Sequence, residues 1–233
     1  MPLSPVVPLG TPVGEVETGF QHAPLHWPLN PMGGPVDITV AIAAGNLPSD
    51  QGVAAPFDEP FPAAFVPLLT AAEEAWESVA NIQFRNIPDG IVPEADIRVG
   101  VSALNTHLGL PNTMGFIGYT EYRYSNLNQF SQDTTVTVED PAEHPLVALP
   151  DGDFQYANTS ATVFQVLLHE LGHGLGLAHN SADLTAIMNP VSMASNRVPD
   201  AQDVAALQSL YGAPTMPLAL SLPDMTALTN LTA

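Results

Sequence analysis

The stretch HELGHGLGLAH, residues 169–179, holds three of the chain's seven histidines and one glutamate among glycines and leucines. On an α-helix, residues four apart lie only about 40° from each other around the axis, so His169 and His173 project from one face. A continuing helix would turn His179 about 240° away from His173. Gly176 can adopt a positive φ without a Cβ penalty. The spacing therefore predicts that the helix ends there and that the chain brings His179 back to the other two.

Three imidazoles predict a zinc site. The chain has no cysteine, which excludes thiolate ligands and disulfides. Zinc at a catalytic site takes three protein ligands and leaves a fourth position for water. We expect one zinc ion, held by His169, His173 and His179. Glu170, directly after the first ligand, is then expected to take a proton from a zinc-activated water and to pass it to a leaving amine.

The alternative is a chance match, because a glutamate and two histidines on a helix can simply be solvated or capped. The turn glycine and the third histidine at the right offset favour the metal site. The other histidines lie in loops or proline-rich segments without ligand spacing, and we interpret them as surface or internally hydrogen-bonded residues: His22, His26, His107 and His144.

The charge of the chain is strongly negative. It has 24 acidic residues, four arginines and no lysine, for a formal net charge of −20. Such a surface repels nucleic acid and anionic lipid, and solubility is a simpler explanation than a cationic partner. No apolar run reaches the length of a membrane span, so no membrane insertion is expected. The first 20 residues lack the basic and apolar regions of a signal peptide, which predicts a cytosolic protein or one whose leader has been removed.

Hydrophobic periodicity predicts strands followed by helices. Residues 1–35 hold eight of the 24 prolines and are interpreted as an extended arm, which we hypothesise contacts the active-site cleft. A helix is expected to start at Ala161, capped by Thr159 or Ser160, and a last helix to follow Asp200 and to stop at Gly212. The remaining expected elements are strands at 36–43, 82–87, 95–102, 115–123 and 134–140 and a helix at 63–80.

HELGHGLGLAH matches every position of HExxHxxGxxH, the zinc signature of the metzincin metalloendopeptidases, and the chain resembles this family. Residues 187–190 (IMNP) resemble its Met-turn, in which Met188 would form an apolar floor below the imidazoles. An ordinary core methionine would pack in almost the same way. Residues 75–84 (AWESVANIQF) are similar to the helix-to-strand passage of serralysins. Residues 202–212 (QDVAALQSLYG) resemble the last helix of matrixins and serralysins, where Asp203 is expected to bond the Met-turn backbone.

The resemblance implies an α+β fold, a metzincin-like catalytic domain with a twisted mixed sheet, three main helices and a Met-turn. We expect this domain at 36–213, between the N-terminal arm 1–35 and a C-terminal tail 214–233. It also implies a secreted, extracellular zinc endopeptidase acting on proteins or peptides. The substrate would lie antiparallel to an edge strand, for which 134–140 is our candidate. The specificity pocket would be lined by Leu167, His169 and the loop 180–193.

Some family features differ or are missing. Pro190 stands where serralysins have a tyrosine ligand, and Gln202 replaces the first of two matrixin aspartates. The HxD pattern of the matrixin structural zinc is absent, so one zinc is expected. The glycine-rich calcium repeats of serralysins are absent too. Without cysteine, latency through a cysteine switch is excluded.

Calcium and two other functions stay open as alternatives. Residues 150–153 (PDGD) with Asp133, Glu139 and Asp140 could supply oxygen ligands for calcium, although tight Asp-Gly turns look the same. A catalytically weak, zinc-stabilised peptide-binding module is one rival function. A calcium-dependent adhesion protein is the other. No sequence feature sets the oligomeric state.

Overall fold

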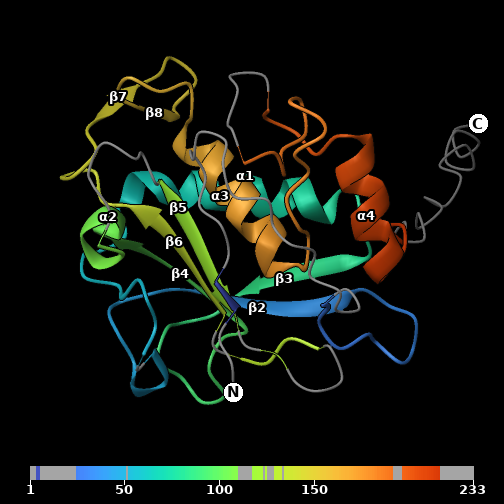
Figure 1. Cartoon of the computed structure of the whole chain (residues 1–233). Helices are drawn as coiled ribbons and strands as arrows, with labels where there is room; N and C mark the ends of the chain where they lie inside the picture. Colours follow the sequence, from blue (N-terminus) through green and yellow to red (C-terminus); the bar gives the residue numbers. More distant parts are fainter. Residues whose placement is uncertain are drawn as a thin grey trace, which may run out of the picture.

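Strands rich in β-branched residues build a twisted mixed sheet at the centre of the protein (Figure 1). The computed structural model describes residues 4–5, 25–50, 52–109, 117–122, 124, 129–132, 134–190 and 196–215. The strands are β1 Ser4–Pro5, β2 Val36–Ile42, β3 Ile82–Asn86, β4 Ile97–Ser102, β5 Gly118–Tyr122 and β6 Thr134–Glu139. Their order in the sheet is β1-β5-β6-β4-β2-β3.

Four strands of the sheet are parallel to one another, and β5 is antiparallel to its neighbour β6. β3, β2, β4 and β6 pair in parallel, and β5 pairs antiparallel with β6, with Gly118 opposite Val138. Among the described residues, only the two-residue β1 pairs with the outer edge of β5, where Ser4 lies opposite Tyr122 and Pro5 opposite Glu121. β3 forms the other edge of the sheet, and within the described part of the chain β1 covers only the Glu121–Tyr122 end of β5.

The prediction that 134–140 forms the edge strand is wrong. β6 lies between β4 and β5, and all six of its residues are buried. The threonines of this segment gave it the polar character of an edge strand, yet both faces of the sheet are covered at β6. Burial of small hydroxyl side chains on an inner strand is hard to distinguish from exposure by pattern alone.

Two long helices, α1 Val66–Glu77 and α3 Val163–Gly174, cover one face of the sheet. The other helices are α2 Leu104–His107 and α4 Ala201–Tyr211. α1 and α3 pack against each other and on the sheet (Figure 1), and the indole Nε1 of Trp76 donates to the Leu168 carbonyl at 2.9 Å. The opposite face carries a smaller cluster in which Ala55, Leu104 and Tyr119 pack together. The expected α+β fold with three main helices is confirmed.

The start of α3 differs from the prediction. Its N-cap is Thr162, and its side chain and that of Gln165 form a capping box, so the helix begins at Val163 and not at Ala161. The segment before it forms a hairpin of β7 Leu146–Ala148 and β8 Phe154–Tyr156, which the sequence pattern did not predict. Among the described residues, no helix is both long and apolar enough to cross a membrane.

Part of the N-terminal region packs into the core. Trp27 is 3% exposed, its indole Nε1 donates to the Gly174 carbonyl at 2.9 Å, and its backbone N–H donates to the Tyr211 hydroxyl at 3.0 Å. The segment around Trp27 thus joins the end of α3 to α4, directly below the HELGHGLGLAH stretch.

Candidate metal centre

The helix α3 places two histidines on one face. Almost all of its residues are buried, and its capping box fixes its start. His169 and His173 are four residues apart and fully buried or nearly so, and their Nε2 atoms lie 3.0 Å from each other. The prediction that these two side chains project from one face of the helix is confirmed.

The turn after α3 brings in the third histidine. Gly176 has a φ of +99°, and a Cβ there would lie 2.0 Å from the Leu25 carbonyl oxygen, so only glycine fits. The Leu177 N–H then donates to the Gly172 carbonyl at 3.0 Å, which closes the turn. The Nε2 of His179 ends 3.2 Å from that of His169 and 3.1 Å from that of His173.

These distances fit a zinc ion. Three nitrogens at the usual Zn–N distance in a tetrahedral site would lie about 3.3 Å apart. Among the described residues, His169, His173 and His179 form the one group of three or more potential ligands whose donor atoms converge.

Hydrogen bonds prepare the ligand atoms. The Nδ1–H of His169 donates to the Ile187 carbonyl at 2.7 Å, and that of His173 to the Leu177 carbonyl at 2.8 Å. Each bond fixes the tautomer that leaves the Nε2 lone pair free. Burial lowers the pKa of His169 to about 3 and that of His179 to about 4, and the pKa of His173 lies well below its usual value. All three rings are neutral at pH 7, the form that binds metal.

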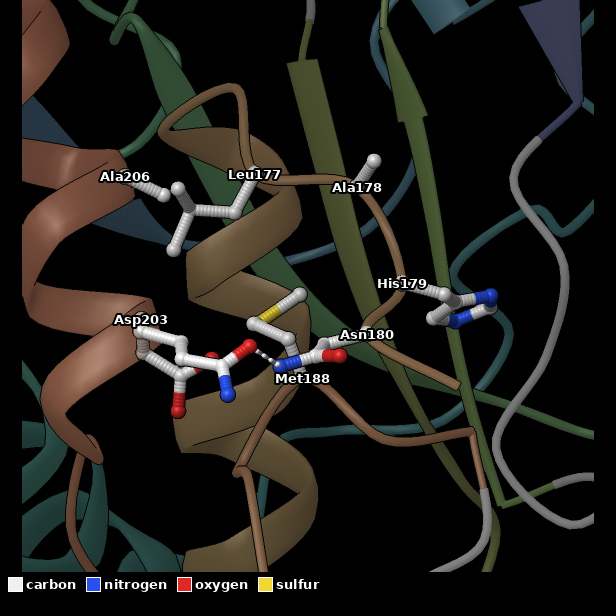
Figure 2. A pocket seen from close by; sticks show the side chains of 8 residues that line it. Leu177, Ala178, His179, Asn180, Met188, Asp203 and Ala206 are labelled. Carbon is white, nitrogen blue, oxygen red and sulfur yellow. Dashed lines mark hydrogen bonds between the residues drawn. The ribbon is translucent and has the colours of Figure 1, made fainter. Parts of the chain in front are cut away.

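Met188 and α4 support the centre from below. Met188 is 1% exposed, and a Cβ on Gly172 would lie 2.4 Å from its sulfur. Met188 therefore packs directly against α3. The Ile187 N–H donates to the Asp203 carboxylate at 2.9 Å, which confirms the expected bond from the last helix to the Met-turn. Figure 2 shows a pocket of about 270 Å³ beside the centre, lined by Met188, Asp203 and Asn180, and Asn180 is hydrogen-bonded to Gln202 at 3.0 Å.

Glu170 lies on the side of α3 that faces β5. It is fully buried, and the Thr120 hydroxyl donates to its Oε2 at 2.7 Å. A Cβ on Gly118 would lie 2.5 Å from its Oε1, so the absent side chain there leaves room for the carboxylate. Burial raises the pKa of Glu170 to about 8, against the lowering effect of the Thr120 bond. Strand alternation places Gly118 and Thr120 on one face, but no sequence signal identified which helix residue they meet.

The other predicted residues lie outside this centre. His107 Nε2 bonds Asp58, His144 Nε2 bonds the Ala157 carbonyl and His26 Nδ1 bonds the Trp27 carbonyl. His22, Asp133 and residues 191–193 of the expected pocket loop lie outside the described residues.

The candidate calcium ligands are engaged in protein contacts. Asp153 of the PDGD turn accepts the N–H groups of Phe154 and Phe164 and pairs with Arg197. Glu139 accepts from the Leu104 N–H and the Asn105 side chain. No calcium-type group of three carboxylates is found in the described part of the chain.

Comparisons with known proteins point to one family. The family model described as Matrixin matches residues 63–212. The chain is 28% identical to Matrix metalloproteinase-C of Caenorhabditis elegans over 153 residues, which cover 62% of this chain and 24% of that protein. It is 46% identical to Stromelysin-1 of Rattus norvegicus over 156 residues, or 63% of this chain and 28% of the relative. It is 30% identical to Metalloendoproteinase 4-MMP of Arabidopsis thaliana over 140 residues, 59% of this chain and 37% of the relative. The matched segment thus spans about a quarter to a third of these relatives' lengths.

Proposed function

Because this chain belongs to the matrixin family, we propose that it is a zinc-dependent endopeptidase that hydrolyses internal peptide bonds of proteins. In this proposal His169, His173 and His179 hold one zinc ion and Glu170 is the general base. The observation that carries the proposal is the convergence of the three Nε2 atoms of His169, His173 and His179 within 3.2 Å of one another.

Each residue around the centre has its own role in the proposed reaction. Zinc, when bound, polarises the scissile carbonyl and lowers the pKa of a coordinated water. Glu170 takes the proton that the attacking water loses and delivers it to the nitrogen of the leaving amine. The carbonyl groups of Ile187 and Leu177 hold the first two imidazoles in the orientation that ligation needs.

We place the substrate along β5. An extended peptide could pair antiparallel with the outer edge of β5 around Gly118–Thr120, where β1 does not reach. Backbone pairing of this kind is nearly independent of sequence, so the pocket next to the metal would set the cleavage preference. Leu167, His169 and the loop 180–193 are the proposed lining of that pocket.

We propose further that the protein acts outside the cell and that 36–213 is the catalytic domain, flanked by the arm 1–35 and the tail 214–233. The packing of Trp27 beneath α3 supports adding residues 25–35 to the folded unit.

The test is a paired assay on the wild type, Glu170→Gln and the control Glu74→Gln, which makes the same change at an exposed position of α1. Metal content is measured by mass spectrometry, and cleavage with an unfolded protein substrate. We expect about one zinc per chain in all three, and a loss of kcat/KM of roughly 10²-fold or more in Glu170→Gln alone.

The opposite results are equally informative. Stoichiometric zinc without cleavage by the wild type would favour the peptide-binding module. Absence of zinc from the wild type would overturn the metal site itself.

A further inference from the structure

Thr120 meets the proposed base from the neighbouring strand. On β5, Gly118 and Thr120 face α3, whereas Tyr119 points to the other face and packs on Leu104. Thr120 is 0% exposed. A buried hydroxyl directed at a buried carboxylate is a polar contact that the packing of a strand on a helix does not require.

The two carboxylate oxygens of Glu170 have different surroundings. Oε2 accepts a hydrogen bond from the Thr120 hydroxyl at 2.7 Å, whereas Oε1 is buried and has no hydrogen-bond partner among the described residues. Oε1 lies next to the space that Gly118 leaves open, since a Cβ there would be 2.5 Å away. One oxygen is therefore anchored, and the other keeps its lone pairs available.

The Thr120 hydroxyl also lies close to a second possible acceptor. The Thr120 hydroxyl oxygen lies 3.0 Å from the backbone carbonyl of Glu170. Its single proton can therefore be donated either to Oε2 or to this carbonyl. Both acceptors belong to Glu170, so the hydroxyl contacts the backbone and the side chain of the same residue.

Building on the endopeptidase function proposed above, we propose that Thr120 is a positioning residue for the reaction. It fixes Oε2 of Glu170 so that Oε1 is the oxygen that accepts the proton from the attacking water and later donates it to the leaving amine. Because the carboxylate is already oriented, it does not have to reorient as the reaction approaches the transition state.

The kinetic test compares four zinc-loaded proteins: wild type, Thr120→Val, Thr120→Ser and the control Thr137→Val. Thr137 is also fully buried, and its hydroxyl has no hydrogen-bond partner in the part of the chain that the structure describes. It lies opposite Tyr119, on the sheet face away from Glu170. We expect Thr120→Val to lose kcat about tenfold or more with KM changed less than about twofold. Thr120→Ser should keep kcat within about threefold, and Thr137→Val should match the wild type. Zinc content should be equal in all four.

Two kinetic results would overturn the proposal. One is a Thr120→Val protein with wild-type kcat. The other is an equal loss of kcat in Thr120→Val and Thr120→Ser, which would show that the methyl packing and not the hydroxyl matters.

A thermal unfolding cycle tests the anchor without any reaction. Thr120→Val should lower Tm by about 3 °C or more in the wild type, because it strands a buried carboxylate oxygen, and by clearly less in a Glu170→Ala background. An equal decrease in Tm in both backgrounds would show that the Thr120 hydroxyl does not hold the Glu170 carboxylate. A wild type that binds zinc but cleaves nothing would overturn the endopeptidase function, while this cycle would still decide whether Thr120 holds Glu170.

Discussion

Glu139 is a buried carboxylate without a cationic partner among the described residues. It is 0% exposed and accepts the Leu104 N–H at 2.8 Å and the Asn105 side chain at 3.0 Å. Burial, helped by Glu143 and Asp140 and opposed by the two hydrogen bonds, raises its pKa from 4.5 to about 8. A group with a raised pKa in the folded state stabilises most below its unfolded pKa, and this stability is lost as pH rises toward the folded pKa.

We therefore predict that Glu139→Gln removes part of the pH dependence of stability. Between pH 5 and pH 8 the wild type should lose free energy of unfolding relative to the variant by about 1 kcal/mol or more, the equivalent of roughly one pKa unit. Urea unfolding at both pH values measures the difference. Parallel profiles of the two proteins would show that Glu139 ionises normally when folded.

At this scale the sequence predicted the convergence of His169, His173 and His179 well and the surroundings of Glu170 poorly. The spacing of His169, His173 and Gly176 is local, because helix geometry and one glycine turn determine where the side chains go. The partners of Glu170 lie about 50 residues away on β5. No local pattern can place a residue of one element against a residue of another that is so distant in the chain.

The Met-turn and α4 form one hydrogen-bonded unit beneath the metal centre. Asp203 accepts the N–H groups of Ile187 and, as part of the helix's capping box, of Asp200. The Ile187 carbonyl in turn accepts the His169 Nδ1–H. A change in α4 should therefore reach the first histidine through a single residue.

We predict that Asp203→Ala lowers the free energy of unfolding by about 1–3 kcal/mol, because the Ile187 N–H loses its partner in a buried site. Zinc affinity should fall by roughly tenfold or more, since the support of His169 loosens. Chelator competition and urea unfolding measure the two effects. Asp203→Asn, which keeps one acceptor oxygen, is the control and should lose less. Unchanged zinc affinity in Asp203→Ala would show that the Met-turn holds His169 without help from α4.

It was easier to predict which strands and helices form than to predict which of them lie next to each other. Each of the strands expected at 36–43, 82–87, 95–102 and 134–140 is present, with ends shifted by up to two residues. The position of 134–140 inside the sheet was missed, because order across a sheet depends on pairing over long sequence distances. The cap of α3 was missed because four consecutive residues, 159–162, include three hydroxyl side chains that could each begin a helix.

Positive charges are scarce across the molecule and are used in ion pairs. Arg98 is 1% exposed, bonds Asp50 and Asp89, and lies 5.3 Å from the Phe57 ring. Arg85 and Arg197, the other arginines that the structure describes, also pair with aspartates. The remaining negative charge of the chain has few counterions within the protein, so self-repulsion opposes folding.

We predict that sodium chloride stabilises this protein. Raising the salt concentration from about 0.01 M to about 0.15 M shortens the screening length from roughly 30 Å to 8 Å, which weakens repulsion between exposed carboxylates. Tm should rise by about 2 °C or more, measured by calorimetry in calcium-free buffer. A Tm that falls with salt would mean that surface ion pairs such as Arg85–Asp37 outweigh the repulsion.

The contact between Gly176 and the Leu25 carbonyl has a consequence for maturation. Trp27 follows two residues later and fills the space beneath the end of α3. A processing protease that shortens this chain from its N-terminal end would therefore have to stop ahead of Leu25. Removal of residues 25–27 would uncover the underside of the turn that carries His179, so the earliest tolerable new N-terminus is set by the metal centre.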